Sequence, residues 1–363
     1  MLNRRTLLAG LALVPLAGGS ALSAPSTLAL FAGTYKSEGG GGVAQLTFAP
    51  AADLARIAGY LPIENASYGV ASRRTGGRYL VSEADQGSVG FYDQDWAPRG
   101  LVSTGGASPC FLALDASERA LAVANYGDGS VALIRLGTDG RPLGPPQVAT
   151  HQGSGPNRER QAGPHAHWVG FSPDQVWLHA VDLGADTVFA HPYDRDQVQI
   201  GEGQVAYAAP AGSGPRHMVR HPHLPVAYLV SELANTLTML AVRDGGRFDA
   251  VEIGSTLPPG FAGHSQAAHI AIDRAGRRLY LSNRGADTLA VFALGATGRP
   301  RLLQQIACGG NWPRAFLLLE GERRLLVANE RSGEVAIFHL LGDGRLRDSG
   351  ARLRAPGTVF LMR

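Results

Sequence analysis

Histidine, arginine and glutamate side chains stand beside short apolar strands in this sequence, in a combination suited to acid–base chemistry on an anion. The four main candidates are His167, Arg216, Glu232 and Arg284. Guanidinium groups aimed at one space bind a carboxylate or phosphate and stabilise a developing oxyanion. A glutamate between arginines stays ionised at neutral pH unless burial raises its pKa, and a histidine titrates near neutrality. Together these groups suit the opening or closing of an ester ring on an anionic substrate.

Two sets of positions with a constant spacing predict that these residues come together. The corner set follows an apolar strand, recurs at steps of 42 to 57 residues and contains Tyr35, Ala84, Tyr126, Leu183, Glu232, Arg284 and Glu330. The first-strand set lies 16 residues before the corner set and contains Tyr68, Cys110, His167, Arg216, Ala268 and Arg314. Because one offset holds in all six copies, both sets belong to one structural repeat.

Each copy of the repeat reads as an apolar strand, a polar corner, a glycine or aspartate turn and an alternating second strand, as in "RALAVANYGDGSVALI" (119–134). Four strands fit one period, which is typical of a β-propeller. The last residues, "APGTVFLMR" (355–363), supply an opening strand without its corner, and the first copy begins at its corner strand. We therefore predict an all-β, seven-bladed β-propeller over residues 25–363, with the last blade closed by both termini.

The first strand of each propeller blade lines the central channel, so both sets should meet at one mouth of it. We expect a charged pocket there, formed by His167, Arg216, Glu232, Arg284, Arg314 and Glu330 together with Tyr35, Tyr68 and Tyr126. His165 would lie at the rim of the pocket, where it would either contact the substrate or anchor the loop. Segment 137–166 is the longest stretch without periodicity and is expected to be functional or mobile. The alternative for the whole pocket is a structural network of ion pairs between blades.

The remaining composition narrows the function class and the compartment. The 48 glycines and 22 prolines suit a turn-rich β protein, and without a basic tract interleaved with aromatics the net charge of +3 indicates no nucleic-acid partner. Residues 1–24 have the basic start, apolar run and small-residue end of a secretory signal, and Arg4-Arg5 is typical of the twin-arginine type. The apolar run is too short to span a membrane. The sequence thus predicts a soluble, periplasmic protein.

Metal binding is the main alternative for the pair His165 and His167, because His-x-His on an extended segment sends both side chains to one side. Further ligands would be needed, and His217 and His269 are the nearest candidates. The abundant arginine nearby argues against a metal ion. Cys110 and Cys308 lie about four blades apart, so we expect no disulfide between them.

Several motifs resemble one family along essentially the whole chain after the signal. They include "GTY" (33–35), "NYGDGSV" (125–131), "GSGPNRERQAGPHAH" (153–167), "GSGPRHMVRHP" (212–222), "SEL" (231–233), "LYLSNRGADTLAVF" (279–292) and "NWPRAF" (311–316). They are similar to the seven-bladed lactonases, a family that contains the propeller-type 6-phosphogluconolactonase and the carboxy-muconate cyclase. The resemblance implies hydrolysis of a sugar lactone without metal or cofactor.

The resemblance also implies roles for individual residues. Binding and catalytic roles fall to His167, Arg216, Glu232 and Arg284. Independently of the resemblance, their expected place near the channel mouth makes the following residues substrate-binding candidates: His165, His217, His269, Arg314, Glu330, Tyr35 and Tyr126. The partner would be a small anionic lactone. Two alternatives remain open: a lactonising cyclase or isomerase of the muconate type, and a non-catalytic propeller that binds through its outer faces.

Overall fold

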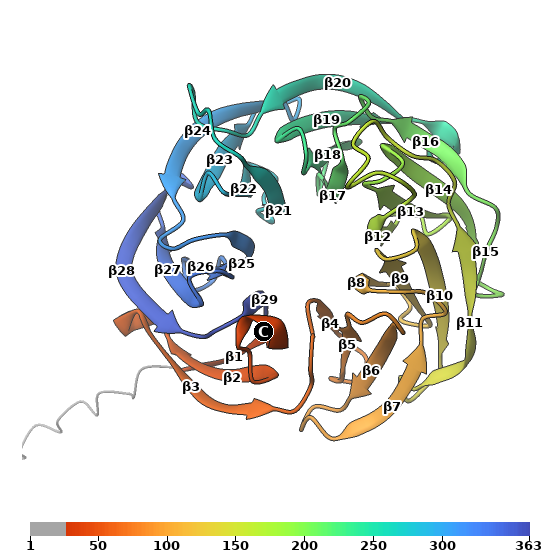
Figure 1. Cartoon of the computed structure of the whole chain (residues 1–363), viewed down its shortest axis with the longest axis horizontal. Coiled ribbons are helices and arrows are strands. Elements are labelled where there is room, and N and C mark those ends of the chain that lie inside the picture. The colour runs from red at the N-terminus through yellow and green to blue at the C-terminus, as the bar shows by residue number, and fades with distance from the viewer. Residues whose placement is uncertain (1–26) are drawn as a thin grey trace, which may run out of the picture.

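A computed structural model describes residues 27–363 and shows seven antiparallel sheets arranged as a closed ring around a central axis (Figure 1). Blade 1 contains β29 (Thr358–Met362), β1 (Leu28–Thr34), β2 (Val43–Ala49) and β3 (Leu54–Leu61). Blade 2 contains β4 (Gly69–Ala71), β5 (Arg78–Ser82), β6 (Ser88–Tyr92) and β7 (Pro98–Ser103). Blade 3 contains β8 (Pro109–Leu114), β9 (Ala120–Asn125), β10 (Ser130–Leu136) and β11 (Pro142–Thr150).

The other blades follow the same plan, each with its innermost strand first. Blade 4 contains β12 (Ala166–Phe171), β13 (Trp177–Asp182), β14 (Thr187–Asp194), β15 (Gln199–Ile200) and β16 (Gln204–Ala208). Blade 5 contains β17 (Pro215–Arg220), β18 (Val226–Ser231), β19 (Thr236–Val242) and β20 (Phe248–Ser255). Blade 6 contains β21 (Gln266–Ile272), β22 (Arg278–Arg284), β23 (Thr288–Leu294) and β24 (Pro300–Ala307). Blade 7 contains β25 (Pro313–Leu319), β26 (Arg324–Asn329), β27 (Glu334–Leu340) and β28 (Leu346–Arg354).

The two ends of the described chain close the ring, as the sequence predicts. Strand β29 pairs antiparallel with β1, with Phe31 opposite Met362 and Ala32 opposite Leu361. The seven-bladed architecture and its closure by both termini are thus confirmed. Between the strands of the described chain lie three short 3₁₀ helices: η1 (Lys36–Glu38), η2 (Pro50–Ala52) and η3 (Asp244–Gly246). No helix within residues 27–363 is long and apolar enough to cross a membrane, and the predicted signal at 1–24 falls outside the described residues.

The apolar core is divided among the contacts between neighbouring blades. Each of the seven buried clusters combines side chains of two adjacent sheets. Between blades 2 and 3, for example, Tyr79 and Val81 of β5 pack against Leu121 and Val123 of β9. Because burial of apolar surface is the main stabilising contribution, the blades hold one another in place and fix the ring of innermost strands.

A β-bulge near the start of the innermost strand positions the first-strand set. In blade 3, Pro109 is opposite Asn125 and Phe111 is opposite Ala124, so Cys110 between them has no partner residue. The same irregularity occurs in five further blades of the described chain, at His167, Arg216, Ala268-His269, Arg314 and Val359. A bulge redirects the side chain of the extra residue. The constant spacing in the sequence therefore reflects a repeated bulge.

Blade 2 corrects the predicted sets by one residue. The N–H of Glu83 donates to the carbonyl of Asn65, as the N–H of Tyr126 donates to Ser108. Asn65 and Ser108 share a left-handed backbone, with φ of 53° and 49°. The members in blade 2 are therefore Ser67 and Glu83, instead of Tyr68 and Ala84. Both predicted positions in blade 2 are wrong by the same one residue. The offset of 16 residues between them is therefore unchanged and could not reveal the error.

Segment 137–166 is only partly a loop. Its middle forms β11 (Pro142–Thr150), the outer strand of blade 3, so the non-strand portion before β12 is 151–165. The alternation in β11 is hidden by two prolines and mostly exposed side chains. Sequence periodicity alone therefore missed this strand.

Candidate active site

Glu232 lies at the centre of a group of arginines at the channel mouth. Only 2% of it is exposed, and it follows β18, where the antiparallel strand turns back at the mouth. Its Oε2 accepts from Arg216 Nε (3.0 Å) and pairs with Arg284 Nη2 (2.6 Å). Its Oε1 accepts from Nη2 of Arg160 (2.7 Å). Three guanidiniums from separate segments thus share one carboxylate.

The charges of this group set the pKa of Glu232. Burial by itself raises the pKa of the carboxyl, but Arg284 and Arg216 more than offset that effect and hold it well below its usual range. Glu232 is therefore a stable anion at neutral pH and a weak base. Its chemistry as placed is to hold guanidiniums in fixed orientations.

A second hydrogen-bonded group covers the other side of the mouth. Arg314 Nη2 donates to the hydroxyl of Tyr35 (2.6 Å), and that hydroxyl donates to Glu83 Oε2 (2.7 Å). Arg314 also lies 3.8 Å from Glu330 through Nη1 and Oε2. Burial lowers the pKa of Arg314, but Tyr35 and the two carboxylates raise it above its ordinary value, so it stays charged.

The two groups leave the mouth with one unbalanced positive charge. The cations are Arg160, Arg216, Arg284 and Arg314, and the anions are Glu83, Glu232 and Glu330. Among the buried polar atoms without a hydrogen-bond partner within residues 27–363, Arg284 Nε, Glu330 Oε2 and Ser67 Oγ belong to residues of the mouth. Buried polar groups are normally paired, so these atoms indicate where a polar ligand or water would bind.

Arg160 is the main residue that the sequence analysis missed. It lies in loop 151–165 between blades 3 and 4, and its Nη2 reaches the hydroxyl of Tyr126 (3.2 Å) as well as Glu232. Its neighbour Gln161 is fully buried and donates to the carbonyl of Leu183 (2.9 Å). The loop also packs closely on Gly184, where a Cβ would lie 1.9 Å from the Gly163 carbonyl oxygen. The loop that seemed structureless therefore completes the site.

Asp182 anchors both ends of this loop. Its Oδ2 is 2.8 Å from Nδ1 of His151 at one end, and its Oδ1 accepts from the backbone N–H of His165 (2.7 Å) at the other. His151 Nε2 is 3.2 Å from Nε2 of His191, whose Nδ1 faces the Gly201 carbonyl (3.1 Å). These three contacts form one chain of polar groups that ties the start of the loop to blade 4.

The histidines of the predicted site occupy different surroundings. His165 is half-buried, stacks on Tyr126 (ring centroids 4.6 Å apart) and donates from Nδ1 to the Tyr126 carbonyl (2.7 Å), so it anchors the loop. His167, His217 and His269 form an edge-to-face row, with successive ring centroids 5.2 and 5.7 Å apart. His167 Nδ1 lies 3.6 Å from Cys110 Sγ, and Cys110 and Cys308 are both free.

Burial and the neighbouring Arg216 lower the pKa of all three histidines in this row, to about 3 for His269 and well below the ordinary value for His167 and His217. They are neutral at pH 7. Together with Ser67, Tyr68, Arg216 and Arg314 they line a cavity of about 20 Å³ at the axis, which has room for about one water molecule. Within residues 27–363, no group of three or more His, Cys, Asp or Glu side chains is placed to hold a metal ion.

Replacing His217 by glutamine should make the protein less sensitive to acid. His217 is neutral in the folded protein, whereas in the unfolded chain it takes up a proton below about pH 6.5. Stability conferred by its lowered pKa is present above pH 6.5, and falls by about 1.4 kcal/mol for each pH unit below it. Urea unfolding at several pH values should show a shallower decline for His217→Gln. His223→Gln, at an exposed turn, is the control, and equal slopes for both variants would contradict the assignment.

Comparisons with known proteins identify the family to which this chain belongs. The family model described as "Lactonase, 7-bladed beta-propeller" matches residues 29–362. The 6-phosphogluconolactonase of Bacillus subtilis is 33% identical over 289 residues, which cover 77% of this chain and 80% of that protein.

Two solved structures have the same architecture over nearly their full length. The periplasmic gluconolactonase of Pseudomonas aeruginosa is 28% identical with a TM-score of 0.87, over 93% of this chain and 99% of that one. A Lactobacillus plantarum protein is 30% identical with a TM-score of 0.86, over the same shares. On fold, family model and full-length similarity, this chain belongs to the seven-bladed β-propeller lactonase family.

Proposed function

We propose that this protein hydrolyses a sugar-acid lactone at the channel mouth formed around Glu232. The observation that carries the proposal is the state of Arg284: its guanidinium is buried, one nitrogen is held by Glu232, and Nε has no partner within the described chain. A fixed donor of this kind stabilises the oxyanion that forms when a lactone carbonyl is attacked. The Bacillus and Pseudomonas relatives, named as lactonases, support the same reaction class.

In the proposed mechanism His167 is the general base. Its imidazole is neutral at pH 7, and because Nδ1 faces Cys110, Nε2 is the nitrogen available to water. His167 takes a proton from a water molecule as the water oxygen bonds to the lactone carbonyl carbon. Arg284 and Arg216 stabilise the tetrahedral oxyanion. The carbon–oxygen bond of the ring then breaks, and the imidazolium returns its proton to the leaving alkoxide.

Glu232 has an organising role in this scheme. Both of its oxygens already accept from guanidiniums, so it is poorly placed to take a proton from water, but they fix Arg160, Arg216 and Arg284 before substrate binds. Preorganisation of this kind avoids reorganisation during the reaction. His165, His217, His269, Arg314, Glu330, Tyr35 and Tyr126 would shape the mouth and contact the sugar.

The charge balance narrows the substrate class. One unbalanced positive charge favours a neutral or singly charged lactone over a phosphate dianion. The twin-arginine signal predicted for residues 1–24 and the periplasmic Pseudomonas relative agree with this, because they point to export. We therefore propose an unphosphorylated sugar lactone in the periplasm as the substrate.

A lactone panel tests the proposal. Initial rates of acid release would be measured with glucono-δ-lactone, 6-phosphogluconolactone and a muconolactone, each corrected for spontaneous hydrolysis. We expect the highest kcat/KM with glucono-δ-lactone. Absence of any rate above the spontaneous one, with folded protein, would reject hydrolysis. Preference for the muconolactone would instead indicate the cyclase chemistry.

Arg160→Ala should lower kcat/KM for the preferred lactone by about tenfold, which corresponds to about 1.4 kcal/mol. The loss is moderate because the Arg160 side chain is 30% exposed and Arg216 and Arg284 still hold Glu232. Steady-state kinetics of the variant check it. Arg158→Ala, an exposed arginine on the same loop, is the matched control. An equal loss in both variants would mean that loop charge in general, and not the Arg160 contact, matters.

A further inference from the structure

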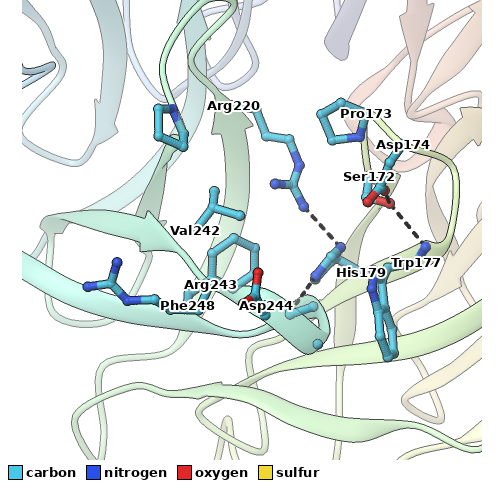
Figure 2. A pocket seen from close by; sticks show the side chains of 13 residues that line it. Ser172, Pro173, Asp174, Trp177, His179, Arg220, Val242, Arg243, Asp244 and Phe248 are labelled. Carbon is cyan, nitrogen blue, oxygen red and sulfur yellow. Dashed lines mark hydrogen bonds between the residues drawn. The ribbon is translucent and has the colours of Figure 1, made fainter.

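One contact that departs from the repeat lies away from the mouth, between blades 4 and 5. Strands β17 and β19 end there and β13 and β20 begin there, so this is the end of the blades opposite Glu232. A pocket of about 370 Å³ opens at this place. Figure 2 shows Arg220, His179, Trp177, Val242 and Phe248 around it.

His179 replaces a tyrosine that other blades use at the same position. In blades 2, 5 and 6 a tyrosine of the second strand donates its hydroxyl to a glycine carbonyl of the next blade, through Tyr79–Gly140, Tyr228–Gly298 and Tyr280–Gly344. In blade 4, His179 Nε2 donates to the Gly246 carbonyl instead (2.8 Å). The imidazole is shorter than a phenol, so the link between blades is kept while space is left beside it.

Arg220 replaces an apolar residue that four other blades use, whereas blade 1 has Arg363 at this position. It stands four residues after Arg216, and the equivalent positions in blades 3, 4, 6 and 7 hold Leu114, Phe171, Ile272 and Leu318. Arg220 Nη2 donates to Nδ1 of His179 (3.0 Å). Both unusual residues of this contact are therefore hydrogen-bonded to each other and line the same pocket (Figure 2).

The corresponding groove between blades 6 and 7 gives a direct size comparison. It is lined by Tyr280, Leu340 and Gly344, which correspond to His179, Val242 and Gly246, and its volume is about 170 Å³. The pocket at blades 4 and 5 has about 370 Å³. The groove that contains His179 and Arg220 therefore has more than twice the volume of the groove between blades 6 and 7.

The positive charge of Arg220 is not neutralised by a contact in this pocket. None of the ion pairs among residues 27–363 includes Arg220, and its Nε is buried without a hydrogen-bond partner in that part of the chain. Burial lowers the pKa of Arg220 only to about 10, so it remains charged, and burial lowers that of His179 to about 4, so it is neutral. Two carboxylates, Asp174 and Asp244, are exposed at the rim. Asp174 raises the pKa of Arg220 in part but makes no ion pair with it, and water screens it.

The walls of the pocket are aromatic and rigid. Phe248 lies under the guanidinium, with Arg220 Cζ 5.2 Å from the ring centroid. Gly246 rests on the indole of Trp177, where a Cβ would come within 2.7 Å of the ring. Gln204 Nε2 also donates to the Gly245 carbonyl (2.7 Å), which ties the turn of blade 5 to blade 4.

From these observations we propose a second ligand site, in which Arg220 binds the carboxylate of a small organic acid and Trp177 and Phe248 contact its flat apolar body. A rigid aromatic pocket with one oriented guanidinium suits such a ligand. The site is independent of the lactonase reaction, because it lies at the other end of the blades and shares no residue with the mouth.

Benzoate and its neutral isostere benzamide test the proposal on the intact protein. Binding would be followed by calorimetry and by quenching of tryptophan fluorescence, with Trp177→Phe to identify the reporter. Arg220→Leu is the key variant, because leucine occupies this position in blades 3 and 7 and should be tolerated. Arg243→Gln, at an exposed rim residue paired with Asp249, and Arg284→Ala, at the mouth, are the controls.

We expect saturable benzoate binding that weakens at least tenfold in Arg220→Leu, is at least tenfold weaker for benzamide, and changes less than twofold in both controls. Equal affinity for benzoate and benzamide in the native protein would overturn the role of Arg220 without relying on any variant. Absence of saturable binding at millimolar benzoate, or its loss only in Arg284→Ala, would overturn the site.

Discussion

Arg284→Ala should lower kcat/KM for lactone hydrolysis by about 100- to 1000-fold, the usual cost of removing one oxyanion donor. The substitution removes a guanidinium that Glu232 holds at 2.6 Å, whose Nε has no partner within the described residues and is the proposed oxyanion donor. Most of the loss should fall on kcat, because the oxyanion exists only in the transition state. Initial rates at saturating and at low lactone concentration separate the two parameters.

Arg331→Ala is the matched control for this variant. Arg331 and Arg284 both place their guanidinium near the Trp312 ring, at 3.3 and 5.5 Å from its centroid, but Arg331 is exposed. The Arg331 variant should keep nearly full activity. A tenth or more of the native kcat remaining in Arg284→Ala would remove Arg284 from the proposed mechanism.

Glu232→Gln should reduce the free energy of unfolding by about 3–5 kcal/mol, the range found when one partner of a buried ion pair is removed. Glutamine keeps the shape of the side chain but leaves Arg160, Arg216 and Arg284 without their shared carboxylate. Urea unfolding checks this loss. Added phosphate should restore part of the stability, since an anion in the mouth replaces the missing charge.

Glu330→Gln provides the comparison for Glu232→Gln. Glu330 is also at the mouth, but its Oε2 lies 3.8 Å from Arg314 and 11% of its side chain is exposed. Because its Oε2 makes no hydrogen bond that the substitution would remove, the change should cost roughly 1 kcal/mol. The assignment of Glu232 as the organising anion fails if the two variants are equally stable.

The Arg284 and Glu232 variants together separate a catalytic site from a structural ion-pair network. In a network that only joins blades, both substitutions would lower stability, and activity per folded molecule would stay constant. In the proposed site, Arg284→Ala loses activity out of proportion to any change in unfolding. Activity should therefore be normalised to the folded fraction at each urea concentration.

Much of the fold could be predicted because the repeat is local. Strand, corner and turn follow one another within a few residues, so the seven blades and the closing strand at 355–363 are visible in the sequence. In blade 2, Ala66 stands where blades 3, 5 and 7 have a proline before the bulge, so no proline marks the position there. The position of Ser67 could then be found only from the hydrogen bond between Glu83 and Asn65.

Part of the candidate site could also be predicted, because several of its residues belong to the repeat. Residues on the repeat, such as Arg216 and Glu232, have their positions determined by strand pairing. Arg160 has no such signal, because its place depends on how Gln161 and Asp182 fold the loop across two blades. The roles of the site residues remain predictions, which the substitutions above address.

The repeated bulge has a practical consequence for engineering. Each bulged residue is skipped by the pairing with the second strand, so exchanging it alters the wall of the channel while the sheet hydrogen bonds on either side remain. Cys110, Ala268 and Val359 therefore form a set of mutational positions around one axis that leaves the proposed catalytic residues in place. A combinatorial library restricted to these three positions would alter the wall of the channel on a constant scaffold.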